Sequence, residues 1–551
     1  MTWNDALILA LAPAWVIFLA WLRRRETPAR PRWGLLTILL LATAGAIFVL
    51  FAFPLKNFVD AFPIDDSYIT LTAARNLAEH NVLAVNLQYP LAGVTSPLHV
   101  AITGLVAKLM PVEIASRVVG LLFFLALGPG VLLWAKELGA RPTTAAAAAA
   151  ISLLGGPLAF GALNGLETTP FAAMLIWTFY VYEVAWRRNR FWLLVGAMIG
   201  LTILTRPEGW FVAAALYIAA GYRFRRDQST REWRRFVFVA LSIATAGVVL
   251  APYLLANLHY DHQLFPSTVS AKKYFFADFC RPFGQRVFIA LLSLILLGLY
   301  VFLTPLLFWS RTFLRRVYPW LFILIFYAAY TSQFVGALTH YWGRYQHPLL
   351  PVLLVGILLG AESLFAGLTR SRRLFPRVVG AGLVLFIFAT AGVGGTIDRR
   401  LYRKALVNSQ VFLMSASDYI RANTAPGEMI GAHDVGALYY FGERPVLDLV
   451  GLADPVVAKI YRTGPKRCSN FNARRVRIYQ MVKSFHPALV YLSPLWEKNY
   501  IGLTTTDRGR HLRPVWHLSQ YFQLDKNNDV KVYEYDFYRC DWDHDLLHEP
   551  H

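Results

Sequence analysis

Long apolar runs separated by short polar segments fill most of the chain up to about residue 395. A helix needs about 20 apolar residues to cross the hydrocarbon core of a bilayer. The pattern therefore predicts a polytopic α-helical membrane protein with about twelve spans. The runs lie near 6–22, 34–53, 116–135, 143–163, 168–184, 191–205, 209–221, 235–256, 286–309, 318–338, 348–366 and 377–395.

Two apolar segments, 6–22 and 97–110, each need a separate argument. The run at 6–22 is followed, and not preceded, by basic residues, and no small-residue cleavage site comes after it. This order differs from that of a secretory signal peptide, so we expect a retained helix. The stretch 97–110 has a length that suits an interfacial or re-entrant helix better than a span.

Basic residues gather in short clusters between the apolar runs. The net charge is +21, although only 16% of residues are charged and 56% are hydrophobic. If 97–110 does not cross and the N-terminus lies outside, every cluster falls in the cytoplasm, as the positive-inside rule requires. The clusters lie at 23–32, 136–141, 187–190, 223–235, 311–316 and 370–377. This distribution explains the positive charge without nucleic-acid binding.

The same orientation predicts two domains of a plasma (inner) membrane protein. Residues 1–395 form a multi-pass membrane domain, with interfacial helices in an outer loop at 54–115. Residues 396–551 form a soluble extracytoplasmic α/β domain, used for acceptor binding or only for structure. Strands are predicted at 429–432, 446–450 and 488–492, helices at 403–422 and 472–485, and a hairpin at 521–538.

The chain has three cysteines, too few for a disulfide framework. Cys468 and Cys540 lie in the C-terminal region that we place outside the cytoplasm, where disulfides form. A bond between them and two free thiols are both open, because the sequence gives no distance.

The first outer loop contains an adjacent acidic pair, Asp65 and Asp66. Either residue would cap a helix that starts near Ser67, which is a purely structural interpretation. Alternatively, one carboxylate is a general base for a sugar acceptor and the other supports it or helps to hold a divalent metal ion. Asp66 is the candidate metal ligand.

Other outer loops contain cations and acids that suit a sugar–phosphate substrate. A leaving phosphate needs cations. The candidate phosphate-binding residues are Lys272, Lys273, Arg344 and Arg206, and the candidate substrate-binding residues are Glu167, Glu208, Tyr345 and His340. Each has a simpler explanation: cations near span ends reach for lipid headgroups, Arg206 and Glu208 pair with each other, and Glu167 caps a helix at Thr168.

Several motifs in this order resemble the GT-C superfamily of polyprenyl-phosphate-sugar-dependent glycosyltransferases. This superfamily includes protein mannosyltransferases, aminoarabinose transferases and mycobacterial arabinofuranosyltransferases. The resemblance covers roughly residues 34–366. The motifs are Asp-Asp-x-Tyr-Ile-Thr at 65–70, Arg-Asn-Leu-Ala-Glu at 75–79, Gly-x-Thr-Ser-Pro-Leu at 93–98, Gly-Leu-Glu-Thr at 165–168, Leu-Thr-Arg-Pro-Glu-Gly at 204–209 and Arg-Tyr at 344–345.

The resemblance implies a GT-C-like fold and sugar transfer from a polyprenyl-phosphate donor to an extracytoplasmic glycan, lipid or protein. It implies that Asp65 is the base and Asp66 an auxiliary or metal-linked carboxylate. The segment 266–272 is similar to a phosphate-side loop of the family, although Ser267 stands where many members have asparagine. The extra N-terminal span also departs from the simplest family layout.

Two other classes of function compete with sugar transfer. A transporter or flippase of lipid-linked glycans would also need outer cations, but it would have polar residues at the bilayer midplane and an internal repeat. The sequence has no clear repeat, and its polar residues gather at one face. A non-catalytic scaffold would use the tail for docking. This alternative does not explain why acidic and basic residues cluster in five separate outer loops.

Overall fold

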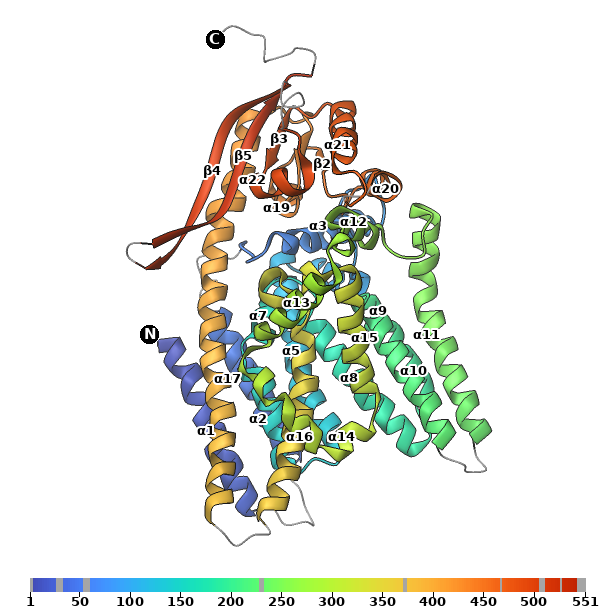
Figure 1. The fold of residues 1–551 in the computed structure, drawn as a ribbon, viewed down its shortest axis with the longest axis vertical. Helices are drawn as coiled ribbons and strands as arrows, with labels where there is room; N and C mark the ends of the chain where they lie inside the picture. Colours follow the sequence, from blue (N-terminus) through green and yellow to red (C-terminus); the bar gives the residue numbers. More distant parts are fainter. Residues whose placement is uncertain are drawn as a thin grey trace.

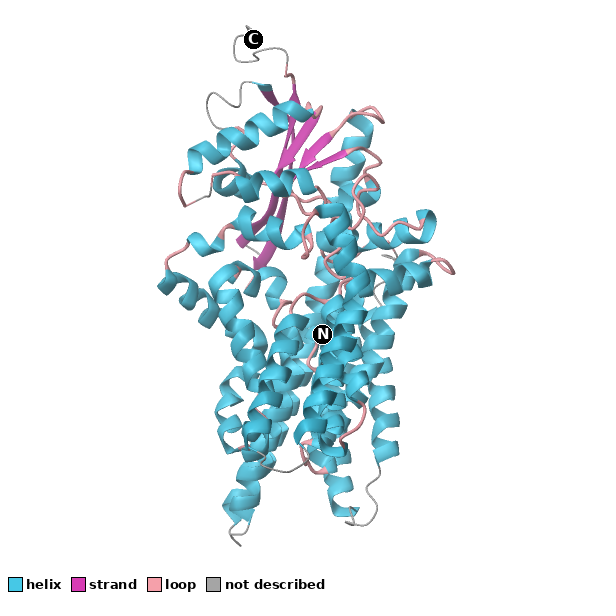
Figure 2. Ribbon diagram, turned by 90° about the vertical axis from the view of Figure 1, so that its right-hand side faces the viewer, coloured by secondary structure: helices cyan, strands magenta, loops and turns pink. Residues whose placement is uncertain are grey.

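The structure is a computed structural model that describes residues 3–25, 33–52, 60–226, 232–369, 374–465, 468–504, 511–525 and 528–542. A bundle of long helices forms one end of the molecule, and a smaller α/β tail domain covers its other end (Figures 1 and 2). Helix α17 (Leu374–Ser409) runs from the bundle into the tail, so residue 395 lies inside a helix and not in a linker.

Seven helical segments of the described chain are long and apolar enough to cross a membrane. An eighth results if α6 (Pro142–Leu154) and α7 (Pro157–Leu163), which meet at 54°, are one broken span. The seven are Trp3–Leu22, Trp33–Ala52, Val112–Glu137, Trp233–Asp261, Phe283–Trp309, His340–Ala366 and Gly382–Asn423. A polytopic α-helical membrane protein is thus confirmed.

Of the predicted spans, about twelve in number, seven or eight meet this criterion of length and hydropathy. The other four apolar runs form α8 (Thr168–Arg188), α9 (Trp192–Thr205), α10 (Gly209–Arg226) and α15 (Tyr318–Gln333). Helices α9 and α15 have 14 and 16 residues, fewer than the roughly 20 that a span needs. Helices α8 and α10 end in arginines, which shorten their apolar parts. All four pack within the bundle.

Short helices lie between the bundle and the tail. They include α3 (Asp65–His80), α4 (Pro97–Ala107) and α12 (Ser267–Phe276), and Figure 1 shows α3 and α12 directly below the tail. Helix α4 has 11 residues and is too short to cross, as predicted for 97–110. The basic cluster at 311–316 begins at α14 (Arg311–Arg315), at the opposite end of the bundle.

The tail contains a five-stranded mixed sheet in the order β2-β1-β3-β5-β4. Strands β1 (Ile430–Ala432), β2 (Val446–Asp448) and β3 (Leu489–Leu492) are parallel, and their fully buried pattern matches their apolar sequences. The antiparallel hairpin of β4 (Leu512–Asp525) and β5 (Asn528–Cys540) starts earlier than predicted. Helices α18 to α21 are Ser415–Asn423, Gly436–Phe441, Pro455–Thr463 and Phe471–Phe485. The predicted α/β tail is confirmed.

A disulfide connects the membrane part to the tail. Cys280, in the loop after α12, bonds to Cys468, in the loop before α21, with Cα atoms 5.3 Å apart. Cys540 is free. The sequence left two alternatives open: a Cys468–Cys540 disulfide, or two free thiols. Both are wrong, because Cys468 is bonded to Cys280 and Cys540 alone is free. The partner lies 188 residues away in the sequence and is brought close only by packing of the tail on the outer loops.

The tail also holds α3 through close backbone contacts. The Asp65 carboxylate accepts hydrogen bonds from the backbone N–H groups of Gly436 and Ala437, both at 2.9 Å, at the start of α19. A Cβ atom at Gly436 would lie 2.0 Å from the Asp65 carbonyl oxygen, so only glycine permits this approach. Arg75 donates to the carbonyl oxygen of Tyr440 at 3.2 Å.

Helix α12 is held in the same way. Phe275 is fully buried in the apolar core of the tail, and Arg474 of α21 donates to its carbonyl oxygen at 2.7 Å. The tail therefore anchors both α3, which begins with the Asp-Asp pair, and α12, which carries the lysine pair.

Candidate active site

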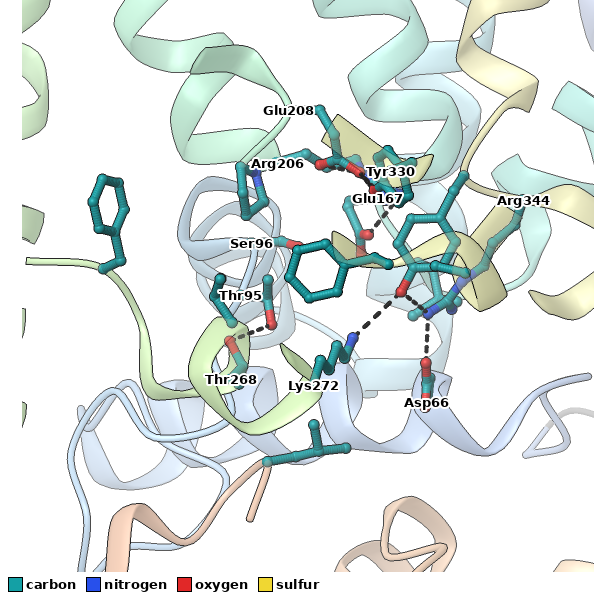
Figure 3. A pocket seen from close by; sticks show the side chains of 18 of the residues that line it. Asp66, Thr95, Ser96, Glu167, Arg206, Glu208, Thr268, Lys272, Tyr330 and Arg344 are labelled. Carbon is teal, nitrogen blue, oxygen red and sulfur yellow. Dashed lines mark hydrogen bonds and ion pairs between the residues drawn. The ribbon is translucent and has the colours of Figure 1, made fainter. Parts of the chain in front are cut away.

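A cavity of about 480 Å³ lies where the outer helices meet the bundle (Figure 3). One wall is polar, and the rest is largely apolar. The polar wall contains Asp66, Glu167, Arg206, Glu208, Lys272, Tyr330, Arg344 and Tyr345. The apolar walls include Trp210, Phe211, Phe265, Val269 and Phe334. Such a cavity suits a ligand that has an anionic group and an apolar chain.

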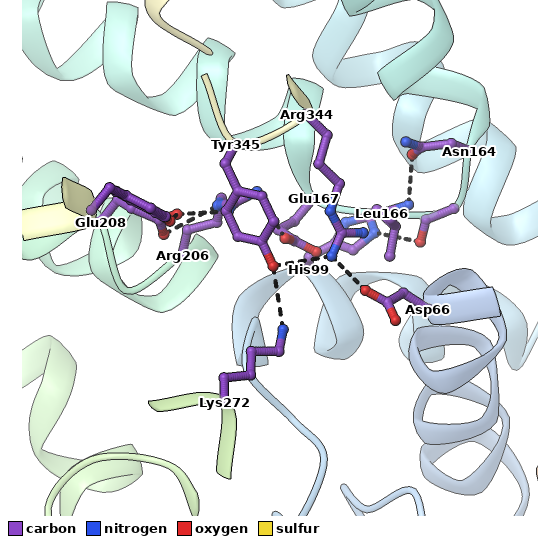
Figure 4. A network of polar contacts seen from close by, with 12 residues as sticks. Asp66, His99, Asn164, Leu166, Glu167, Arg206, Glu208, Lys272, Arg344 and Tyr345 are labelled. Carbon is purple, nitrogen blue, oxygen red and sulfur yellow. Dashed lines mark hydrogen bonds and ion pairs between the residues drawn. The ribbon is translucent and has the colours of Figure 1, made fainter. Parts of the chain in front are cut away.

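Asp66 faces the cavity and is surrounded by cations (Figure 4). Its carboxylate forms an ion pair with the Arg344 guanidinium at 2.5 Å. The Tyr345 hydroxyl accepts from Arg344 at 3.2 Å and from the Lys272 ammonium at 3.3 Å. Burial alone would raise the pKa of Asp66, but Arg344 and Lys272 hold this pKa below its ordinary value. Asp66 is therefore an ionised carboxylate beside two cations.

A second group, on the other side of Tyr345, is a buried ion cluster. Arg206 contacts Glu167 at 3.1 Å and Glu208 at 2.6 Å, and Tyr330 donates a hydrogen bond to Glu208. The Arg206 side chain is 3% exposed. Burial would raise the pKa of Glu208, but the contact with Arg206 lowers it. A buried arginine between two carboxylates fixes all three side chains along one wall.

Local sequence explains how these residues reach the wall. Helix α9 ends at Thr205 because Pro207 follows Arg206, and a residue before proline avoids the helical conformation. Arg206 is extended, with φ −156° and ψ 147°. Gly165 has φ +76° and adjoins Phe62, where a Cβ would clash, so its turn needs glycine before Glu167.

The sequence offered a simpler structural explanation for Glu167, for the Arg206–Glu208 pair and for Arg344, and the structure bears out only the pairing of Arg206 with Glu208. Glu167 stands at the N-cap of α8, but its side chain makes no cap hydrogen bond and pairs with Arg206 instead. Arg206 and Glu208 do pair with each other, and both still line the cavity. Arg344, at 5% exposed, is buried in an ion pair and does not extend to lipid headgroups.

Asp65 points away from the cavity that Asp66 lines. Helix α3 begins at Asp65, two residues before the predicted start, and neither aspartate caps it, because its N-cap residue is Ile64. The Asp65 carboxylate caps the first N–H groups of α19. Burial, and next the charge of Asp434, raise the pKa of Asp65 to about 8.

Lys273 and His340 also lie outside the cavity lining. The Lys273 ammonium sits 5.5 Å from the centre of the Tyr274 ring. His340 packs against the rings of Tyr341 and Tyr345. Of the ten predicted site residues, seven line the cavity. His340 lies behind them, against Tyr345 and within electrostatic reach of Asp66 and Arg344, whereas Asp65 and Lys273 do not line the cavity. The assigned roles themselves stay predictions.

Sequence reasoning missed some cavity residues. Tyr330 lies inside an apolar run, which gave no signal that it contacts Glu208. Thr95 donates a hydrogen bond to Thr268 at 3.1 Å, and both line the cavity. Thr95 belongs to the Gly-x-Thr-Ser-Pro-Leu motif, so this motif could have identified it.

Asp66 is the residue to which the sequence assigned a divalent cation. In the described parts of the chain, no three histidine, cysteine, aspartate or glutamate side chains are grouped closely enough to hold a metal ion. Asp66 and Glu167 are each engaged by an arginine. Hard divalent cations need several oxygen ligands, so we assign no step to a metal. The predicted cation requirement stays a prediction.

A family model described as "Domain of unknown function (DUF8728)" matches residues 400–537. No curated protein sequence matches the chain.

Solved structures of two proteins are similar to this chain over nearly its whole length. ArnT from Cupriavidus metallidurans, bound to undecaprenyl phosphate, has a TM-score of 0.55 and 16% identity, covering 91% of this chain and 97% of that chain. AglB, the archaeal oligosaccharyltransferase from Archaeoglobus fulgidus, in complex with an inhibitory peptide and a dolichol-phosphate, has a TM-score of 0.58 and 13% identity, covering 93% of this chain and 75% of that chain. At these identities the likeness concerns the fold alone, and this chain has a GT-C-like fold.

Proposed function

We propose that the protein transfers a sugar from a polyprenyl-phosphate donor to an acceptor on the outer side of the plasma membrane. The acceptor class is a cell-envelope glycan, lipid or protein. The observation that carries the proposal is the convergence of Lys272 and Arg344 on Asp66 in a cavity with largely apolar walls. The fold supports it, because the similar ArnT and AglB structures contain a lipid phosphate.

In the proposed reaction, Lys272 and Arg344 bind the donor phosphate, and the apolar walls contact its lipid. Asp66 accepts the proton of the acceptor hydroxyl while the hydroxyl oxygen forms a bond to the anomeric carbon. The bond from that carbon to the phosphate oxygen breaks, and the polyprenyl phosphate leaves with the electron pair. The two cations stabilise the negative charge that remains on this phosphate. Attack opposite the leaving group inverts the anomeric configuration.

This proposal moves the role of base from Asp65 to its neighbour Asp66. Asp66 lines the cavity, whereas both oxygens of Asp65 accept backbone hydrogen bonds from α19. Asp65 then acts as a positioning residue. It fixes the start of α3 against the tail and so holds Asp66 next to Arg344.

The direct test is sugar transfer by membranes that contain the protein, with labelled polyprenyl-phosphate sugars as donors. Transfer that depends on the protein supports the proposal. If the wild-type protein binds donor lipids and moves them across liposome membranes without transferring sugar, the protein is a transporter and the proposal is wrong.

Replacing Lys272 with glutamine should weaken donor binding. Its ammonium contacts Tyr345 at 3.3 Å and faces Asp66, so the neutral variant loses one charge beside the proposed phosphate. We expect the KM for the donor to rise about tenfold or more, since hydrogen bonds to charged groups are worth roughly 1.5–3 kcal/mol. Lys273→Gln is the matched control, because the neighbouring lysine does not line the cavity. Equal effects of the two substitutions would contradict the assignment.

The pH dependence of transfer separates the two aspartates. The pKa of Asp66 is below its ordinary value, so a base at this position is already ionised in weak acid. We expect kcat to change little from about pH 5.5 to about pH 8. If Asp65 were the base, its pKa of about 8 would make kcat rise with pH through this range. Initial rates at saturating donor and acceptor distinguish the two profiles.

A further inference from the structure

A second cavity, of about 430 Å³, lies between the start of α1 (Trp3–Arg25) and the middle of α17. In Figure 1 the N-terminal end of α1 lies beside α17, below the tail. The residues that line it are Asp5, Arg399, Arg400, Arg403, Lys404, Val407 and Asn408. Four cations thus surround one carboxylate, and this small volume has an excess of positive charge.

Asp5 fixes part of this cluster. Its carboxylate forms ion pairs with Arg399 at 2.9 Å and with Arg400 at 3.0 Å, and Asp5 itself is 1% exposed. Arg399 also donates to the carbonyl oxygen of Leu50 at 2.8 Å, near the end of α2 (Trp33–Ala52). These contacts join three helices and explain Asp5 and Arg399. Arg403 and Lys404 are exposed and add two further positive charges to the lining of the cavity.

The level of the cavity along α17 is set by the sequence. The largely apolar part of α17, from Val378 to Ile397, is about 30 Å long at about 1.5 Å per residue, which matches the hydrocarbon thickness. The basic residues follow directly, and Asp5 precedes the apolar run of α1. The cavity therefore lies at the depth of the lipid headgroups, on the side of the bundle that carries the tail.

Exposed apolar side chains lie next to the cavity, on the side that faces the membrane interior. On α17, Val393 and Ile397 are 50% and 59% exposed. Val393, Ile397, Arg400 and Lys404 follow one another at steps of four, three and four residues. This spacing places all four side chains on one face of the helix. On α1, Leu7 is also half exposed. An apolar stripe that ends in a group of cations is complementary to an amphiphile with a negatively charged head.

We propose that this cavity binds the phosphate-bearing headgroup of an anionic membrane lipid, whose acyl chains lie along the exposed stripe of α17. Charge complementarity selects an anionic head over a zwitterionic one, and depth in the bilayer selects a lipid over a soluble anion. The site is separate from the first cavity, since none of its lining residues is shared. It does not depend on the proposed transfer reaction.

The test uses purified full-length protein in detergent with added dioleoylphosphatidylglycerol, and native mass spectrometry counts the bound lipids. We expect the wild-type protein to bind phosphatidylglycerol at least several-fold more tightly than phosphatidylcholine. Arg403→Gln with Lys404→Gln should reduce this affinity about tenfold or more, because each cation near an anionic head contributes substantially. Lys459→Gln with Lys498→Gln removes the same charge from the tail and should leave the affinity unchanged.

Arg403→Lys with Lys404→Arg keeps both charges, and it should bind phosphatidylglycerol like the wild-type protein. A double glutamine variant that binds as tightly as the wild type overturns the proposal. Equal affinity for phosphatidylcholine overturns recognition of charge. Release of the lipid by millimolar inorganic phosphate would identify the cavity as a soluble-phosphate site instead.

Discussion

Replacing Asp66 with asparagine is expected to lower kcat for sugar transfer by about 100-fold to 10,000-fold, the usual contribution of a general base. Asparagine has nearly the same size, and its amide oxygen can still accept a hydrogen bond from Arg344. It cannot accept the proton of the acceptor hydroxyl. Donor binding should therefore persist while transfer is lost. The measurement is single-turnover transfer, together with binding of labelled polyprenyl phosphate to the purified variant.

Asp65→Asn is the matched control for this result. Its carboxylate bonds to Gly436 and Ala437 outside the cavity, so its loss should loosen α3 and reduce transfer much less than Asp66→Asn does. If Asp65 acts only through this contact, Gly436→Ala, whose Cβ would clash with the Asp65 carbonyl oxygen, should disrupt the same contact and reduce transfer at least as much as Asp65→Asn does. Complete loss in Asp65→Asn alone, with Asp66→Asn active, would return the role of base to Asp65.

Arg206→Met should destabilise the protein more than any other single change in the cavity wall. Arg206 is buried between Glu167 and Glu208, and methionine leaves two buried carboxylates without their cation. Breaking a buried ion pair by removing one partner costs about 3–5 kcal/mol. We expect a clearly lower thermal denaturation midpoint in detergent, measured by intrinsic fluorescence, in addition to loss of transfer.

A charge-neutral variant separates this electrostatic effect from lost packing. Glu167→Gln and Glu208→Gln, combined with Arg206→Met, remove both unpaired carboxylates, and glutamine still accepts the Tyr330 hydrogen bond. This triple variant should recover much of the midpoint, because a buried ion cluster can be replaced by neutral groups at little cost. A midpoint as low as that of Arg206→Met would mean that the loss comes from packing and not from charge.

Much of the candidate site was predictable because its residues follow apolar runs in the sequence. Arg206 and Glu208 lie in one turn, and Glu167 lies in another. Polar residues at the ends of membrane helices are costly unless they have partners, so their positions alone indicated a shared role. The structure adds the partners: Arg206 contacts both glutamates, and Arg344 contacts Asp66.

The assignment of the two aspartates required the tertiary structure. Asp65 and Asp66 are adjacent and chemically equivalent in the sequence. On a helix, neighbouring residues point about 100° apart, so only one of them faces the cavity. The other meets α19, whose first N–H groups attract a carboxylate. Which of the two faces the cavity depends on the rotation of α3, and contacts with the tail set this rotation.

Not every predicted span meets the criterion of length and hydropathy, for a related reason. Apolar runs report that a segment avoids water, but residues such as Tyr182 of α8 are buried against other helices. Burial in protein and burial in lipid produce the same hydropathy. Length and the position of charges then decide which helices meet the criterion for crossing, and only seven or eight of the described segments meet it.

The sequence by itself determined the helical membrane architecture, the α/β tail and most of the residues that form the polar wall. These features depend on local hydropathy, on turn residues such as Pro207 and Gly165, and on charges at helix ends. The tertiary structure alone decided which aspartate faces the cavity, that Cys280 is the partner of Cys468, and how the tail holds α3 and α12. These features depend on contacts between residues far apart in the chain, which form only when the tail packs on the outer helices.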